Sequence, residues 1–136
     1  MKTEFEVSTL IHAPPEEIYK AWLDSEGHAN MTGGSASVSA EVGGEFEAWD
    51  GYIRGRNLEL EYGKRIVQSW RTMEFSENEE DSQIEVTFER MGDGTKVTLR
   101  HTKLSAQGGQ YEQGWVDNYF KPMKEYFESG RCHHQA

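Results

Sequence analysis

The stretch YEQGWVDNYFKPM, residues 111–123, decides the fold. Its large apolar side chains recur every four residues, which places them on one face of an α-helix. These residues are Tyr111, Trp115, Tyr119 and Met123. We predict a long amphipathic helix from about Gly109 to Phe127, with this face buried. Pro122 cannot donate a hydrogen bond to residue 118, so we expect a kink or bend there.

Upstream of this helix, apolar and polar residues alternate, as is typical of strands with one buried face. The clearest hairpin pairs Ile84–Glu89 with Lys96–His101 across Gly92-Asp93-Gly94. Four earlier strands are predicted at residues 4–11, 45–49, 52–62 and 64–73. Asp50-Gly51 and Tyr62-Gly63 mark the turns between the last three.

One short helix is predicted directly after the first strand. Pro14-Pro15 followed by Glu16-Glu17 puts proline and carboxylates in a first helical turn, where both are favoured. Segment 24–44 is rich in glycine and is predicted to be irregular, with a second helical turn near Glu26–Met31. The order of elements indicates an α+β fold, an antiparallel sheet with the helices on one face. We expect one domain over residues 1–128 and a flexible tail at 129–136.

The net charge of the chain limits the classes of partner that it can bind. With 24 acidic and 14 basic residues the net charge is −10, which opposes binding to nucleic acid and to anionic membrane surfaces. No apolar stretch is long enough to span a membrane, and the N-terminus is predicted to be a strand and not a secretion signal. The single cysteine, Cys132, fits a reducing compartment. We therefore expect a cytoplasmic protein.

Several separated segments resemble one known family. They are IHAPPEEIYKAW at 11–22, GGEF at 43–46, DGYIRG at 50–55, GKRIVQSW at 63–70 and YEQGW at 111–115. Together they resemble the domain of activator of heat-shock-protein-90 ATPase homologues, within the START-like (SRPBCC) helix-grip superfamily. The resemblance covers roughly residues 5–128 and implies a curved antiparallel sheet wrapped around a long C-terminal helix.

The resemblance also implies a function. It favours a non-enzymatic, chaperone-associated or stress-linked domain that binds a small hydrophobic ligand under the C-terminal helix, a partner protein, or both. Two departures from the family pattern matter. Met31 stands where members often carry an aromatic pair, which implies a softer pocket mouth. The full co-chaperone also has a separate N-terminal domain that these residues do not contain, so we expect little stimulation of the chaperone ATPase.

Six residues are candidate ligand contacts on these grounds. They are Trp70, His101, Trp115, Tyr119, Met123 and Met31. His101 has the same parity as Val97 and Leu99, which predicts that it faces the helix. A histidine there could transfer protons, but a buried structural histidine is commoner. We therefore predict no catalytic residue, and retain as the alternative a cyclase, aromatase or hydrolase-like enzyme acting on a planar hydrophobic substrate.

Other polar groups receive simpler interpretations. Asp50 is interpreted as a turn residue, and the role of Arg71 is left open between a ligand carboxylate and surface acids. Cys132-His133-His134 lacks the spaced partners of a metal site, so no metal and no cofactor are predicted. A second alternative is a structural homodimer formed through a sheet edge or the glycine-rich segment after Met31; monomer and homodimer both stay open.

Overall fold

The computed structural model describes residues 3–32, 34–75, 78, 80–92, 94–104 and 110–134. Strand β1 (Thr3–Ile11) is followed by helices α1 (Pro15–Trp22) and α2 (Ser25–Thr32). The remaining strands are β2 (Ala36–Val38), β3 (Glu45–Ala48), β4 (Ile53–Glu61), β5 (Arg65–Thr72), β6 (Ser82–Met91) and β7 (Gly94–Leu104). The last helical segment comprises α3 (Gln110–Trp115), the π turn η1 (Val116–Phe120) and α4 (Lys121–His134).

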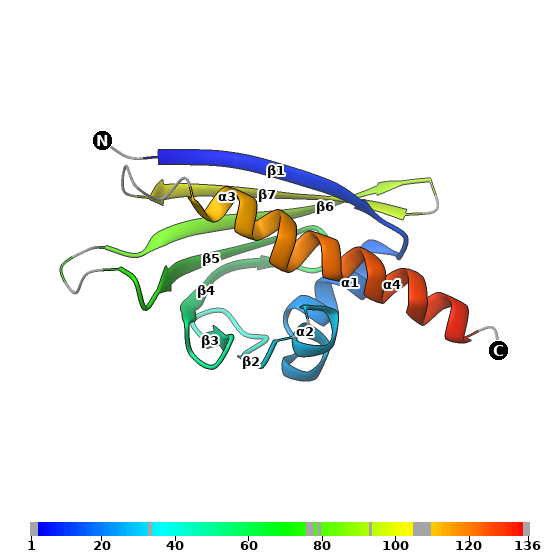
Figure 1. Ribbon diagram of the computed structural model, residues 1–136, viewed down its shortest axis with the longest axis horizontal. Helices are drawn as coiled ribbons and strands as arrows, with labels where there is room; N and C mark the ends of the chain where they lie inside the picture. Colours follow the sequence, from blue (N-terminus) through cyan, green and yellow to red (C-terminus); the bar gives the residue numbers. More distant parts are fainter. Residues whose placement is uncertain are drawn as a thin grey trace.

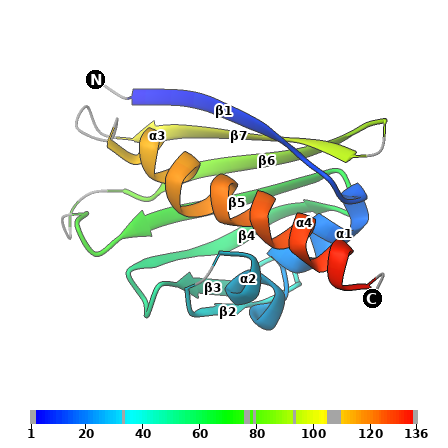
Figure 2. The same ribbon diagram turned by 45° about the vertical axis from the view of Figure 1, so that its right-hand side comes forward.

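The strands form one curved sheet in the order β1-β7-β6-β5-β4-β3-β2. Every neighbouring pair is antiparallel. The α3–α4 segment runs obliquely across one face of the sheet, while α1 and α2 gather beside α4 at one end (Figures 1 and 2). The predicted α+β helix-grip architecture is confirmed.

Alternating burial explains why the sheet closes on the helix. On β6 and β7 the inward residues are buried and the residues between them are not. The buried set that was predicted from parity is Ile84, Val86, Phe88, Val97, Leu99 and His101. These side chains pack with α1 and with the helical ladder in one core. The energy of folding therefore comes mainly from joining the concave face to the helices.

The C-terminal helix contains a π turn just before Pro122, the residue at which a kink or bend is predicted. The N–H of Lys121 bonds to the carbonyl of Val116, five residues back. Because Pro122 has no N–H to give to Asn118, a regular α-helical bond is missing at this point, and a wider turn is one way to absorb the defect. The helical backbone then continues.

The predicted end of this helix at Phe127 is wrong, because α4 extends to His134. The only strong helix-disfavouring residue after Phe127 is Gly130, which costs about 1 kcal/mol relative to alanine and does not by itself end a helix. Gly109, the predicted start, lies outside the described residues. The flexibility of segment 129–136 stays a prediction.

Segment 24–44 is more ordered than predicted. The helical turn expected near Glu26–Met31 is confirmed as α2, but β2 was missed. Its three residues pair with β3, Ala36 opposite Ala48 and Val38 opposite Phe46. Three residues are too few to show a period-two pattern, so only the tertiary pairing reveals this strand.

The turn between β3 and β4 is confirmed at Asp50-Gly51 and has an unusual backbone. Trp49, Asp50 and Gly51 all have positive φ, at 56°, 58° and 84°. A bulky residue rarely adopts this conformation. Ser35 holds it in place: its carbonyl accepts from the N–H of Trp49 at 2.8 Å, and its hydroxyl accepts from the N–H of Asp50 at 2.7 Å.

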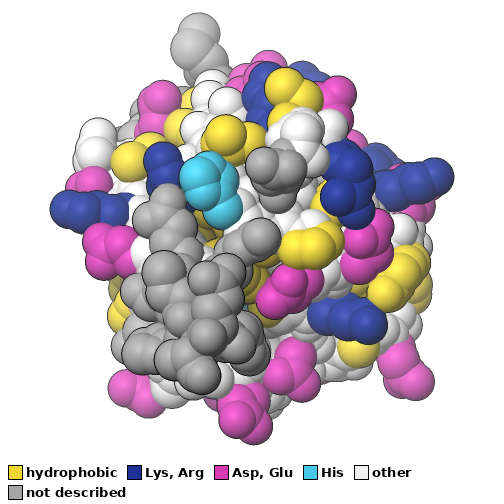
Figure 3. Space-filling view, turned by 90° about the vertical axis from the view of Figure 1, so that its right-hand side faces the viewer, with side chains coloured by type: hydrophobic (Ala, Val, Ile, Leu, Met, Phe, Trp, Pro, Cys, Tyr) yellow, Lys and Arg dark blue, Asp and Glu magenta, His cyan; other side chains and the backbone are white. Residues whose placement is uncertain are grey.

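The outer surface carries both signs of charge. Figure 3 shows acidic and basic side chains interspersed over the end of the molecule where α4 finishes. Ion pairs on the outer face of the sheet include Arg56 with Glu45 at 3.1 Å and Arg100 with Glu4 at 3.6 Å. None of the described helices combines the length and the apolar character needed to cross a bilayer.

Candidate ligand-binding cavity

A cavity of about 330 Å³ lies between the first turns of the C-terminal helix and the strands β4 and β5. Its described walls are Trp49, Tyr52, Ile53, Trp70, Tyr111, Gly114, Trp115, Asn118 and Tyr119. Aromatic rings dominate this wall. Its size falls at the small end of the usual range for small-molecule sites, roughly 300–1,000 Å³.

Two parts of the chain supply the cavity walls. The helix contributes positions 111, 114, 115, 118 and 119, which are spaced as one helical face. The strained turn after β3 contributes Trp49, and β4 and β5 contribute Ile53 and Trp70. Gly114 leaves open space, because a Cβ built there would meet nothing closer than Asn118 at 3.8 Å.

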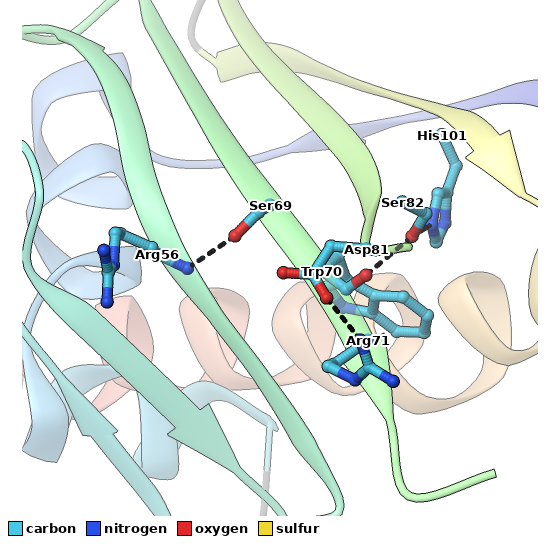
Figure 4. Close-up of polar contacts among 7 residues, drawn as sticks. All are labelled: Arg56, Ser69, Trp70, Arg71, Asp81, Ser82 and His101. Atoms are coloured by element: carbon cyan, nitrogen blue, oxygen red, sulfur yellow. Dashed lines mark hydrogen bonds and ion pairs between the residues drawn. The ribbon is translucent and has the colours of Figure 1, made fainter. Parts of the chain in front are cut away.

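Trp115 is fixed by a chain of hydrogen bonds that runs behind the cavity. Its Nε1 donates to Nδ1 of His101 at 3.0 Å. Nε2 of His101 lies 2.8 Å from Oγ of Ser82, and that hydroxyl donates to the carbonyl of Trp70 at 2.9 Å. Since the hydroxyl proton is used on the carbonyl, Nε2 must be the protonated nitrogen of a neutral imidazole. Figure 4 shows His101 and Ser82 side by side.

Tyr119 is fixed in the same manner by a second histidine. Nδ1 of His28 lies 2.9 Å from the carbonyl of Trp22, and Nε2 lies 3.0 Å from the hydroxyl of Tyr119. A carbonyl can only accept, so Nδ1 carries the proton and the tyrosine donates to Nε2. Burial raises the pKa of Tyr119, and a hydrogen bond from the side chain of Trp49 opposes that rise.

Both histidines are held neutral by their surroundings. Burial lowers the pKa of His101 to about 3. Burial also lowers the pKa of His28, although the hydrogen bond to Trp22 partly opposes the shift. Protonation would place an N–H where the indole of Trp115 or the hydroxyl of Tyr119 donates. These histidines therefore act as structural acceptors that support the helical wall.

A polar cluster lies beside the mouth of the cavity. The hydroxyl of Tyr52 donates to Glu74, and the hydroxyl of Tyr111 lies 2.9 Å from Oγ1 of Thr72. Burial, together with the bond to Glu74, raises the pKa of Tyr52 to about 12. Tyr52 is therefore a neutral donor or acceptor at ordinary pH.

The predicted ligand contacts divide into two groups. Trp70, Trp115 and Tyr119 lie together on the cavity wall. His101, Met31 and Met123 are fully buried and are not part of the described wall; they belong to the core around it. His101 faces inward, as its parity predicts, and its ring packs against the wall residues Trp70 and Trp115, with centroids at 4.6 Å and 5.9 Å.

Sequence reasoning did not select the remaining wall residues. Tyr111 and Gly114 could have been found, because both lie on the same helical face as Trp115 and Tyr119. Trp49 and Tyr52 flank the predicted turn at Asp50-Gly51 and line the cavity. The sequence of a turn does not indicate which distant residues its side chains contact. Their assignment needed the tertiary structure.

The other singled-out polar residues lie outside the cavity. Asp50 is an exposed turn residue that accepts a hydrogen bond from the hydroxyl of Ser35 at 2.9 Å. Arg71 projects from the opposite face of β5, where it pairs with Asp81 at 2.6 Å (Figure 4). The described residues contain no cluster of three or more acidic, cysteine or histidine side chains that could hold a metal. The side chains of Cys132, His133 and His134 lie outside the described part.

Comparisons with known proteins agree with this fold and show the family to which the chain belongs. A sequence model described as "Activator of Hsp90 ATPase homolog 1-like protein" matches residues 12–128. The human activator of 90 kDa heat shock protein ATPase homolog 1 is 29% identical over 117 residues, which is 85% of this chain and 34% of the human protein. This chain thus spans about a third of that relative.

Solved structures share the fold of this chain. An Hsp90 activator from Plasmodium falciparum superposes with a TM-score of 0.78 at 26% identity, covering 87% of this chain and 91% of that one. The Aha1 dimer from Colwellia psychrerythraea has a TM-score of 0.78 at 18% identity, covering 93% and 96%, and shows the shared fold. The chain belongs to the family of Activator of Hsp90 ATPase homolog 1-like proteins.

Proposed function

We propose that this chain is a non-enzymatic binding domain whose cavity holds a small, flat, apolar molecule. The observation that carries the proposal is the aromatic wall of the cavity, with Trp70, Trp115 and Tyr119 facing Trp49 and Tyr52 around about 330 Å³. Rings bury a large apolar area and favour stacked or edge contacts with other rings. A planar molecule fits this geometry better than a flexible chain does.

The wall is organised before any ligand arrives. Trp115 and Tyr119 are each held by a hydrogen bond to a buried histidine, so neither ring has to lose much rotational freedom on binding. Binding to a pre-organised site avoids part of the entropy cost that opposes association. This favours a cavity that remains open over a core that collapses.

The same geometry disfavours the enzymatic alternative. The described wall residues carry no carboxylate, histidine or lysine, and their titratable groups are tyrosines. Burial raises the pKa values of Tyr52 and Tyr119, which makes them poor acids and bases near neutral pH. His101 has both ring nitrogens engaged. A cyclase, aromatase or hydrolase-like reaction would need another source of proton transfer.

Native mass spectrometry of the purified protein, followed by identification of any retained molecule, tests the proposal. We expect a bound apolar, ring-containing compound, or saturable binding of one from a panel of flavonoids and polyketide-like compounds with fatty acids as the flexible comparison. Chemical turnover of the added compound would favour the enzymatic alternative. Failure of every compound to bind would overturn the proposal.

A second candidate function is association with a heat-shock-protein-90 chaperone. The specific observation in its favour is the family match over residues 12–128 and the Plasmodium falciparum structure described as an Hsp90 activator. The net charge of −10 would make such binding depend on complementary basic groups, and therefore on salt. Calorimetric titration of the chaperone at low and high salt would test it.

A homodimeric module in a cytoplasmic setting is the remaining alternative. Strand β1 lies at one edge of the sheet and short β2 at the other, and edge strands can pair with a second copy. Light scattering across a concentration series would separate a dimer from a monomer. A stable dimer that binds no small molecule would favour this alternative over the cavity.

A further inference from the structure

The four tryptophans differ in how their indole N–H groups are satisfied. Trp22 donates to Oε1 of Gln68 at 3.3 Å, and Trp115 donates to His101 at 3.0 Å. Trp49 is only half-buried, and its side chain lies close enough to Tyr119 to oppose the rise that burial causes in the pKa of that hydroxyl. Trp70 is only 3% exposed, and its buried Nε1 has no hydrogen-bond partner among the described residues.

An unpartnered buried donor is uncommon in native proteins, because the group has lost its hydrogen bonds to water without replacing them. Trp70 also lines the cavity. Figure 4 shows its indole extending from β5 toward the helix, on the opposite side of the strand from Arg71. The unused donor therefore belongs to a residue that lines the proposed binding site.

Nearby acceptors are already engaged elsewhere. Rings of Tyr111 and His101 lie close to the Trp70 ring, with centroids at 5.0 Å and 4.6 Å. The hydroxyl of Tyr111 is bonded to Thr72, and Nδ1 of His101 accepts from Trp115. The hydroxyl of Ser82 accepts from His101 and donates to the carbonyl of Trp70. None of these neighbours accepts from the Trp70 N–H, and a molecule in the cavity could supply the missing acceptor.

The charges around the cavity restrict what that acceptor can be. No arginine or lysine is part of the described wall, and Arg71 is paired with Asp81 on the outer face. A carboxylate in this apolar space would be desolvated without a cation to compensate it. A neutral carbonyl oxygen can accept one hydrogen bond at a much smaller desolvation cost.

We propose that the ligand is a planar, uncharged aromatic compound with a carbonyl oxygen, and that this oxygen accepts the hydrogen bond from Nε1 of Trp70. The rings of the ligand occupy the space among Trp115, Tyr119 and Tyr52. The hydrogen bond fixes the orientation of the ligand, and the apolar wall supplies most of the affinity. This inference rests on the proposed binding function.

The experiment uses two probes of nearly equal shape, 2-acetylnaphthalene and 2-isopropylnaphthalene. Only the first has a carbonyl. In ¹⁵N-labelled protein we expect the indole proton of Trp70 to move downfield on adding the ketone, and to move much less with the hydrocarbon. The signals of the other three indoles report contact or stacking without a new hydrogen bond.

Affinities for both probes are then measured in the wild type and in Trp70→Phe, which keeps a ring and removes the N–H. Comparing the ratio of the two affinities cancels the different hydration of the probes. We expect the preference for the ketone to fall by about tenfold in Trp70→Phe, the effect of losing one hydrogen bond. Trp22→Phe is the matched control, because Trp22 is outside the described wall and should leave the ratio unchanged.

The outcomes separate this inference from the function on which it rests. If neither probe binds the wild type, and no compound in the wider panel binds, the proposed function fails. If both probes bind and the ratio is the same in Trp70→Phe, the cavity binds ligands but the carbonyl assignment is wrong. An upfield Trp70 indole proton that the ketone leaves unmoved would show that the N–H points at a neighbouring ring, which also overturns the inference.

Discussion

The indole Nε1 of Trp115 lies 3.0 Å from Nδ1 of His101, and this contact joins the C-terminal helix to strand β7 through the core. The two residues are 14 positions apart in sequence, and both are at most 3% exposed. The bond orients a ring that lines the cavity and also fixes the tautomer of the histidine behind it. Support for the helix and shaping of the cavity therefore depend on the same pair.

Truncating Trp115 should destabilise the fold strongly. We expect Trp115→Ala to lower the free energy of unfolding by about 3–5 kcal/mol, because it removes a buried ring and leaves His101 without its donor. Part of the ring borders open space, so a value at the lower end would fit the cavity. Denaturant unfolding measures the loss. Val116→Ala, at a position 37% exposed, is the control and should change stability by less than about 0.5 kcal/mol.

The two buried histidines predict acid lability. Because burial lowers the pKa values of His101 and His28 below 6.5, the unfolded chain binds more protons than the folded one as the pH falls. Their contribution is fully present above about pH 6.5 and is lost as the pH falls toward the folded pKa, about 3 for His101. Each histidine can contribute a slope of up to about 1.4 kcal/mol per pH unit.

Urea unfolding between pH 7 and pH 5 measures this slope in a range where most carboxylates stay ionised. His101→Gln replaces the titrating imidazole by an amide, which can still accept and donate hydrogen bonds. The slope should become shallower in this variant than in the wild type. An equal slope in both proteins would contradict the assignment of His101.

Filling the cavity from Gly114 should block binding without unfolding the protein. A Cβ at this position has open space, and the residue is within α3, so Gly114→Ala should raise stability by about 0.5–1 kcal/mol and leave binding largely intact. Gly114→Leu should extend into the cavity and reduce ligand affinity by at least about tenfold. Calorimetric titration and thermal unfolding of both variants give the two readouts. Unchanged affinity in Gly114→Leu would place the ligand elsewhere.

This chain alone should stimulate the ATPase of a heat-shock-protein-90 chaperone weakly or not at all. It corresponds to about a third of the human relative, whose remaining length includes sequence that this chain does not match. A steady-state ATPase assay over increasing concentrations of this chain measures the effect. Saturable stimulation would contradict the prediction, while salt-sensitive binding without stimulation would agree with it.

The sequence by itself determined the layout of the fold. The four-residue ladder that includes Trp115 and Tyr119 predicted the helix, and the alternation through Ile84 and Leu99 predicted the strands and their inward faces. These properties depend on local periodicity, which is visible in any short window of sequence. The inward direction of His101 follows from the same periodicity.

Only the tertiary structure decided which inward residues meet empty space. His101 and Trp70 both face the concave side, yet one is enclosed behind Trp115 and the other borders the cavity. Trp49 joins the wall because Ser35, far from it in sequence, holds its backbone at positive φ. A cavity is the volume that packing leaves unfilled, so it depends on contacts between distant segments, and no local pattern in the sequence encodes it.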